Sequence, residues 1–207
     1  AASDVYKRQI LNHCDEAGVT AMYLSAGMDE GDIIEIRRTP IYPMETTSEL
    51  MKRLSHIAAE LACDTARAIE AGTAGRTPQE ESKATYAPML SKAMSPIDWS
   101  ECGQYVIDHG RGLIPWPVAT AELDGKTFKI FRVEKTEKTT DKAPGTLLAL
   151  TRRGLEVACG GGEVLVITEL QAEGGLMRVA VRTTFDPGKI KAVSYTHLRA
   201  HETRHDL

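Results

Sequence analysis

Apolar and polar positions early in the chain are patterned as in β-strands. Residues 18–25 are rich in strand-forming types, and residues 32–38 mix isoleucine with charged side chains until Pro40 and Pro43 end the run. A glycine-containing segment, residues 26–31, separates the two runs. The pattern therefore predicts two strands joined by a loop.

The apolar spacing then becomes that of a helix. Thr46 and Glu49 have capping-box spacing, in which the hydroxyl caps the Glu49 amide and the carboxylate reaches back to Thr46. The apolar residues that follow at helical spacing are Leu50, Leu54, Ile57, Leu61 and Ala68, and Gly72 suits the helix end. Because two strands and one helix cannot enclose a core, we expect residues 10–73 to be the last part of a larger α/β domain.

Residues 74–96 shift to Gly, Pro, Ser, Thr, Lys and Glu, a composition typical of a linker. A second unit is predicted to begin near Ile97, with a short helix that Ser100 caps and that ends near residues 110–112.

Short strands separated by turns follow this helix. The predicted strands are residues 118–123, 127–133, 145–149, 155–159 and 164–170, and Asp124-Gly125 is a strong hairpin signal. Residues 160–162 are three glycines without the GK[ST] ending of a phosphate loop, so we interpret them as a hairpin turn. Five short strands in this length predict a small β-barrel over residues 97–192, with the OB-fold as the leading form.

Composition narrows the class of protein. The 207 residues are 42% hydrophobic and 26% charged, which excludes collagen, coiled coil and wholesale disorder. No apolar run reaches the roughly 18 residues of a membrane span. The four cysteines form no CxxC pair, which favours free thiols in a reducing cytoplasm over disulfides or a zinc site.

The two ends, residues 1–9 and 193–207, resemble translated sequencing-adapter segments, and we expect both to lie outside the fold. His197, His201 and His205 have helical spacing that could stack three imidazoles. We favour an unselected tail, because a metal site needs partners that orient its ligands. No metal site is predicted.

Positive charge is concentrated in one region, although the net charge of the whole chain is −4. Between Arg111 and Arg153 there are nine basic and five acidic residues. This balance is typical of a surface that meets a phosphate backbone, and equally of a solvated rim.

Six short motifs occur in the order and spacing of the methionyl-tRNA formyltransferase family, which the chain resembles from Ile10 to Ala192. They are Gly18-Val19-Thr20, residues 26–33, residues 84–92, Ile97-Asp98-Trp99, Pro115-Trp116-Pro117 and residues 143–146. The resemblance implies the end of a Rossmann-like catalytic domain, then a linker and an OB-like domain that helps to hold tRNA.

The resemblance also implies a reaction in translation initiation. A formyl group passes from 10-formyltetrahydrofolate, the co-substrate, to the amino group of methionyl initiator tRNA. No metal, membrane or DNA is involved, and we expect a cytoplasmic monomer.

Asp29 matches the family's catalytic Asp, which orients a histidine and helps to manage the proton that leaves the amine. Gly27, Met28 and Gly31 match the loop that faces folate. Asp32 is the nearest competitor and is expected at the start of the next strand, where it caps or solvates the turn.

The chain departs from the family pattern in one important respect. The family's oxyanion donors, an Asn and a His, come from an N-x-H-x-S-L-L-P segment that this sequence does not contain. Asn12 and His13 are adjacent rather than spaced, and they fall where the family has a surface turn. We therefore expect the 207-residue chain by itself to be a truncated, inactive piece.

For tRNA contacts we select basic residues at turns, in the linker and at the end of the short helix: Lys92, Arg111, Lys126, Arg152 and Arg153. Met89 stands where relatives usually have a basic residue. Lys129 and Arg132 should point to opposite faces of their strand unless the strand twists or bulges.

Two alternatives remain open from the sequence. A sugar-nucleotide formyltransferase or a formyltetrahydrofolate-hydrolysing domain shares the α/β core, but residues 86–92 resemble the tRNA-acting branch. A non-catalytic RNA-binding barrel is the alternative from another class. The partial α/β domain and the few barrel aromatics, Trp116, Phe128 and Phe131, argue against it.

Overall fold

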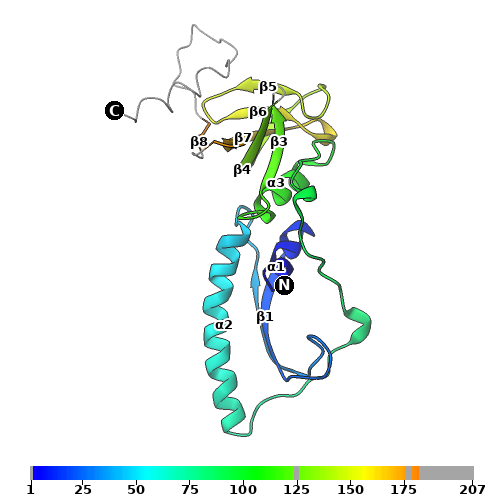
Figure 1. Cartoon of the computed structure of the whole chain (residues 1–207), viewed down its shortest axis with the longest axis vertical. Coiled ribbons are helices and arrows are strands. Elements are labelled where there is room, and N and C mark those ends of the chain that lie inside the picture. The colour runs from blue at the N-terminus through cyan, green and yellow to red at the C-terminus, as the bar shows by residue number, and fades with distance from the viewer. Residues whose placement is uncertain (1, 124–125, 176–178, 182–207) are drawn as a thin grey trace, which may run out of the picture. The chain divides into compact units, whose positions relative to one another are not determined.

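The computed structural model describes residues 2–123, 126–175 and 179–181, and the chain divides into two compact units (Figure 1). Unit 1 comprises Ala1–Ile97 with Asp108–Ala119, and unit 2 comprises Asp98–Ile107 with Thr120–Leu207. The predicted tail at 193–207 with its three histidines, and the Asp124-Gly125 turn, lie outside the described residues.

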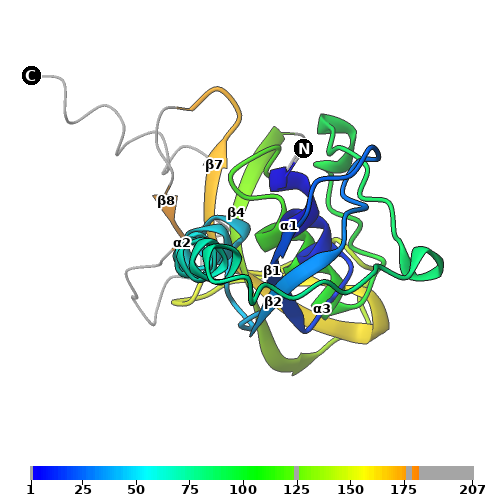
Figure 2. The same ribbon diagram turned by 90° about the horizontal axis from the view of Figure 1, so that it is seen from below.

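Unit 1 is a strand pair beside one long helix. Its elements are α1 (Ala2–Leu11), β1 (Glu16–Met22), β2 (Ile33–Pro40) and α2 (Thr47–Glu70). β1 and β2 are antiparallel, and α2 contacts both strands as well as α1. Figure 2 views α2 nearly along its axis, with β1, β2 and α1 beside it. The core consists of Ile10, Ala17, Leu50 and Leu54, so the predicted apolar face of the helix is the buried one.

Both predicted ends of α2 are confirmed. The Glu49 amide donates to Thr46 Oγ1 at 3.4 Å, and the Thr46 amide donates to Glu49 Oε2 at 2.8 Å, which completes the capping box. After the helix, Gly72 adopts φ +67°, a left-handed conformation that glycine tolerates without cost.

The expectation that residues 1–9 lie apart from the fold is wrong for the described part of this segment. α1 begins at Ala2 and runs without a break into Ile10 of the core. Tyr6 packs against that core, and Arg8 Nε donates to the carbonyl of Pro88 at 3.1 Å. The segment therefore packs in unit 1, because its apolar and basic side chains meet partners there.

Residues 74–96 carry two 3₁₀ turns, Glu81–Lys83 and Lys92–Met94, in otherwise irregular backbone. Near the start of this stretch Thr77 forms an antiparallel bridge with Ile33, through N···O distances of 2.7 and 2.9 Å. The predicted linker is thus joined to the β1–β2 pair at this point.

Unit 2 is a six-stranded sheet with one short helix. Its strands are β3 (Ala119–Leu123), β4 (Lys126–Thr139), β5 (Leu147–Leu150), β6 (Leu155–Ala158), β7 (Glu163–Ala172) and β8 (Val179–Ala180). The sheet order is β3-β4-β7-β6-β5, with β8 also paired to β7. The five predicted strands are confirmed, and a turn at Gly160–Gly162 joins β6 to β7 as predicted. Within the described ranges the sheet does not close, since β3 and β5 remain its two ends.

Helix α3 (Gly103–Gly112) crosses the division between the two units, and its predicted cap is wrong. Ser100 bonds its own turn instead, since its amide and hydroxyl donate to Asp98 Oδ1. The Gly103 amide donates to Glu163 Oε2 at 2.5 Å, so a carboxylate from β7 caps the N-terminus of this helix.

Candidate functional site

The loop between β1 and β2 carries Asp29 at an exposed position. Asp29 has φ +59°, a left-handed conformation that aspartate tolerates better than most residues. Met28 beside it is 87% exposed. Among the described residues no side chain bonds the Asp29 carboxylate, so this acceptor group faces solvent and is available to a ligand.

The two loop glycines differ in how closely the chain approaches them. A Cβ at Gly31 would lie 1.6 Å from the carbonyl oxygen of Tyr23, so no side chain fits without displacing backbone. A Cβ at Gly27 would meet the Glu30 carboxylate, a flexible group that can move away. Gly31 therefore fixes the loop path, whereas Gly27 only leaves room within it.

Three residues of the predicted linker hold this loop. Gln79 Nε2 donates to the carbonyl oxygens of Asp29 and Gly31 at 2.8 and 2.7 Å. Arg76 lies 4.1 Å over the Tyr23 ring, and Thr77 supplies the bridge to Ile33. Sequence reasoning missed all three, because contacts between residues about fifty positions apart leave no local periodicity.

Asp32 differs from Asp29 in its environment. Its carboxylate accepts from Arg76 Nη1 at 3.2 Å, and its carbonyl accepts the Tyr23 amide at 2.9 Å. Asp32 thus closes the base of the loop next to β2, which fits the structural role predicted for it.

His13 lies at the end of α1 with φ +56°. Its Nδ1 is 2.6 Å from Oδ2 of the buried Asp108, which also pairs with Arg111. This arrangement links α1 to Asp108 within unit 1.

The basic face of unit 2, defined here as Lys129, Arg132 and Arg153, combines β4 with the β5–β6 turn. The register of β4 against β7 shifts between Ile130 and Arg132, which marks a bulge. Buried positions accordingly pass from Ile130 to Val133, so Lys129 and Arg132 share the outer face. The strand therefore has the bulge that the sequence-based prediction required for these two side chains to share a face.

Glu134 neutralises part of that face. Its two carboxylate oxygens accept from Arg132 Nε at 3.0 Å and from Arg153 Nη2 at 3.1 Å. Burial raises the pKa of Glu134, but the hydrogen bonds from the two arginines outweigh it, and the pKa is lowered overall.

Two further glutamates pair with basic residues of β4. Glu156 accepts from Lys138 at 2.7 Å, and Glu163 pairs with Lys135 at 2.6 Å. Both glutamates lie after Arg153 in the sequence, outside the stretch whose charge predicted the basic surface. The excess of positive charge is consequently smaller in the folded sheet than along the chain.

The remaining predicted tRNA residues fall into two groups. Lys92, Lys126 and Arg152 are exposed. Arg111 lies in unit 1 with only 10% of its side chain exposed, and it donates to the carbonyls of Tyr42 and Glu45. Arg111 therefore has a structural role in unit 1, which sequence position alone did not indicate.

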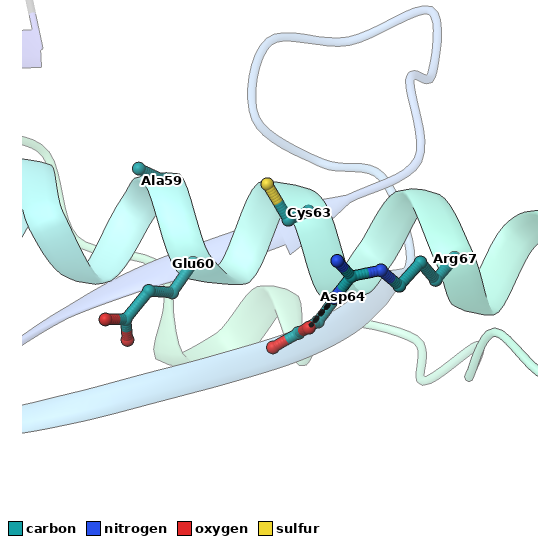
Figure 3. A pocket seen from close by; sticks show the side chains of 5 residues that line it. All are labelled: Ala59, Glu60, Cys63, Asp64 and Arg67. Atoms are coloured by element: carbon teal, nitrogen blue, oxygen red, sulfur yellow. Dashed lines mark hydrogen bonds and ion pairs between the residues drawn. The ribbon is translucent and has the colours of Figure 1, made fainter.

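A depression of about 380 Å³ lies on the outer surface of α2, lined by Ala59, Glu60, Cys63, Asp64 and Arg67 (Figure 3). Asp64 accepts from Arg67 at 3.1 Å and from Arg37 of β2 at 2.6 Å. None of the predicted site residues lines it, and one of its carboxylates, that of Asp64, attaches α2 to β2.

Comparison with known families decides what these two units are. A family model described as formyl transferase matches residues 3–65, beginning within α1, and one described as formyl transferase, C-terminal domain, matches residues 89–183. The chain belongs to the formyl transferase family. Asp29 and its loop fall in the first match, and the sheet of unit 2 falls in the second.

Individual relatives agree with this assignment. The chain is 44% identical to a methionyl-tRNA formyltransferase of Geotalea uraniireducens and 42% identical to one of Citrifermentans bemidjiense, each over 165 residues, or 80% of this chain. These matches cover 52% and 51% of the two relatives, so the chain spans about half the length of the curated relatives it matches.

A solved structure of HypX from Aquifex aeolicus in complex with tetrahydrofolic acid shares the fold. Its TM-score is 0.65 at 19% identity, and the match covers 86% of this chain and 31% of HypX. Over the described part of the chain, no helix is long and apolar enough to cross a membrane. The same residues contain no group of three or more His, Cys, Asp or Glu side chains that could hold a metal ion.

Proposed function

We propose that this chain supplies the Asp29 loop and the tRNA-contacting domain of an enzyme that transfers a formyl group from 10-formyltetrahydrofolate to methionyl initiator tRNA. The observation that carries the proposal is the exposed Asp29 carboxylate, held on a fixed loop within the formyl transferase match. The names of the relatives support tRNA as the acceptor.

Asp29 has a chemical role in this reaction. The amine of the acceptor attacks the formyl carbon, and it must lose a proton as the new C–N bond forms. An exposed carboxylate next to the reacting amine can accept that proton or stabilise a neighbouring imidazolium. Gly27, Met28 and Gly31 would shape the loop on which the folate co-substrate lies.

Unit 2 is proposed to meet the tRNA backbone through charge and shape rather than base stacking. Lys126, Arg152 and Arg153 are the proposed contacts there, together with Lys92 of the linker. Lys129, brought to the same face as Arg132 by the bulge, joins this set. Arg111 is left out because its guanidinium is engaged inside unit 1.

The domain limits are part of the same proposal. Residues 10–73 would end the catalytic domain, 74–96 would link it, and 97–192 would form an OB-like tRNA-binding domain. The six short strands of unit 2, paired in one sheet, are the observation that supports an OB-like domain. We place the reaction in the cytoplasm, with a monomeric enzyme and no metal.

The test of the reaction is a chimaera in which the N-terminal half of the Geotalea uraniireducens relative precedes Ile10 of this chain. Incubated with 10-formyltetrahydrofolate and methionyl initiator tRNA, the chimaera should produce formylmethionyl-tRNA. The 207-residue chain by itself should not, because it lacks the N-x-H-x-S-L-L-P donors, and loss of one such donor costs about 10²–10³ in rate. A chimaera that formylates an amino sugar nucleotide but no tRNA would contradict the proposed acceptor.

The test of tRNA contact is a salt titration of binding by the 207-residue chain. In the double variant Arg152→Ala/Arg153→Ala, the slope of log K against log salt should fall by roughly 0.7–0.9 for each phosphate that loses its partner. Lys52→Ala, an exposed lysine on α2, is the matched control and should leave the slope unchanged. Binding that does not depend on salt would show that the basic residues only solvate the rim.

A further inference from the structure

We propose that Gln79 is a positioning residue for the Asp29 carboxylate, and that Arg76, Thr77 and Gln79 together form a clamp on the Asp29 loop. The catalytic part of this inference rests on the proposed function, whereas the clamp itself stands on the geometry of unit 1.

The Gln79 amide lies between the two ends of the turn that carries Asp29. Its Nε2 donates to the Asp29 carbonyl at 2.8 Å and to the Gly31 carbonyl at 2.7 Å. A primary amide nitrogen carries two N–H groups, so one side chain can serve both carbonyls at once. This pair of bonds fixes the Asp29–Glu30 and Gly31–Asp32 peptide planes, and with them the direction in which Asp29 projects.

Gln79 is itself held against the strand pair. Thr77, two residues earlier, exchanges two backbone hydrogen bonds with Ile33 at the start of β2. Arg76 stacks on Tyr23 after the end of β1 and pairs with Asp32 before β2. Arg76 and Thr77 therefore contact the two ends of the loop, and Gln79 contacts its middle.

The loop has few bonds of its own to perform this task. Within residues 23–32 the side-chain and backbone bonds that the structure shows are Ser25 Oγ to the Gly27 carbonyl at 3.2 Å and the Tyr23 amide to Asp32 at the base. Catalysis by a carboxylate depends on holding it within a fraction of an ångström of its target. The two hydrogen bonds from Gln79 supply this constraint to an exposed loop that has few bonds of its own.

The clamp can be tested on the 207-residue chain by ¹⁵N relaxation. Asp29 and Gly31 should have backbone order parameters near about 0.8 in the native chain and below about 0.6 in Gln79→Ala. Gln171→Ala is the matched control, because Gln171 also donates to one backbone carbonyl, that of Gly175, but in unit 2. Unchanged order parameters in Gln79→Ala would overturn the clamp.

An isosteric variant separates hydrogen bonding from packing. In Gln79→Glu a carboxylate would face two carbonyl oxygens, so the loop should be as mobile as in Gln79→Ala at pH 7. Protonation restores one donor, and part of the order at Asp29 should return as the pH falls below about 4. If Gln79→Glu retains native order at pH 7, shape alone holds the loop and the hydrogen-bonding account is wrong.

The positioning role is tested in the chimaera by steady-state kinetics. Gln79→Ala should lower kcat by about 10-fold to 100-fold and change the KM for tRNA by less than about 2-fold. A mobile loop with unchanged kcat would overturn the positioning role. If the chimaera is inactive with Gln79 intact, the formyl-transfer proposal fails, and the order parameters still decide the clamp.

Discussion

In unit 1 the Asp29 loop is fixed by bonds to backbone groups, from Gln79 within the loop and from Thr77 at the start of β2, and the carboxylate is left exposed. In unit 2 the basic face is fixed by bonds between charged side chains, since Glu134 holds both Arg132 and Arg153. The two regions carry the proposed chemistry of the same enzyme but stabilise their charged residues in opposite ways.

This difference has a physical consequence. A bond to a backbone carbonyl positions a residue without consuming the charge of its side chain. A bond between a guanidinium and a carboxylate positions both groups, but the carboxylate also neutralises the positive charge that would attract a phosphate. Removing a bond that holds the Asp29 loop should therefore lower the rate of formyl transfer. Removing the carboxylate that holds the arginines of unit 2 should raise the affinity for tRNA.

The largest effect is expected from Gly31→Ala in the chimaera. The added methyl group would lie 1.6 Å from the Tyr23 carbonyl, so the loop must move and the rate of formyl transfer should fall by about 100-fold or more. Gly27→Ala is the matched control, since only the movable Glu30 side chain stands in its way. Equal rate losses in the two variants would show that the loop path is not fixed at Gly31.

Glu134→Gln should have the opposite sign in unit 2. It releases Arg132 and Arg153 from their carboxylate, and tRNA affinity at low salt should rise by about 3-fold to 10-fold. The salt slope should steepen by roughly 0.7–0.9 for each additional phosphate that a released arginine neutralises. Fluorescence anisotropy of labelled tRNA measures this binding, with Glu137→Gln as the control at an exposed glutamate. Weaker binding in Glu134→Gln would mean that Glu134 positions the arginines for tRNA.

The smallest effect is a difference in acid sensitivity between the units. Burial lowers the pKa of His109 in unit 1, against raising contributions from the backbone of Ser95 and Met94. Below about pH 6.5 the His109 imidazole binds a proton in the unfolded chain but not in the folded one. The free energy of unfolding of unit 1 is therefore full above this pH and falls as the pH drops below it. In unit 2 a hydrogen bond from Lys135 lowers the pKa of Glu163, so its contribution is lost only as the pH falls below about 4.5.

The two tryptophans report on the units separately, because Trp116 lies in unit 1 and Trp99 in unit 2. Fluorescence of Trp99→Phe and Trp116→Phe chains during urea unfolding should show unit 1 weakening first as the pH falls from 7 to 5.5. His109→Gln should remove that early loss, whereas His56→Gln on the surface of α2 should not. A unit 1 midpoint that is constant over this range would contradict the account of His109.

Elements set by local pattern were predictable from the sequence, and contacts between distant segments were not. The capping box at Thr46 and the strands of unit 2 follow from spacing alone, and so does the loop between β1 and β2. The Gln79 clamp and the Glu163 cap on α3 join residues 48 and 60 positions apart, which no periodicity records. Charge counted along the chain likewise missed Glu156 and Glu163, which the sheet brings beside lysines of β4.

The most direct test of the central claim compares Asp29→Asn with Asp32→Asn in the chimaera. Both changes remove one carboxylate from the same loop, but only Asp29 is proposed to touch the reacting groups, while Asp32 pairs with Arg76. Asp29→Asn should lower kcat for formylation of methionyl-tRNA by at least about 100-fold, and Asp32→Asn by less than about 10-fold. Activity retained in Asp29→Asn, or lost equally in both variants, would contradict the role assigned to Asp29.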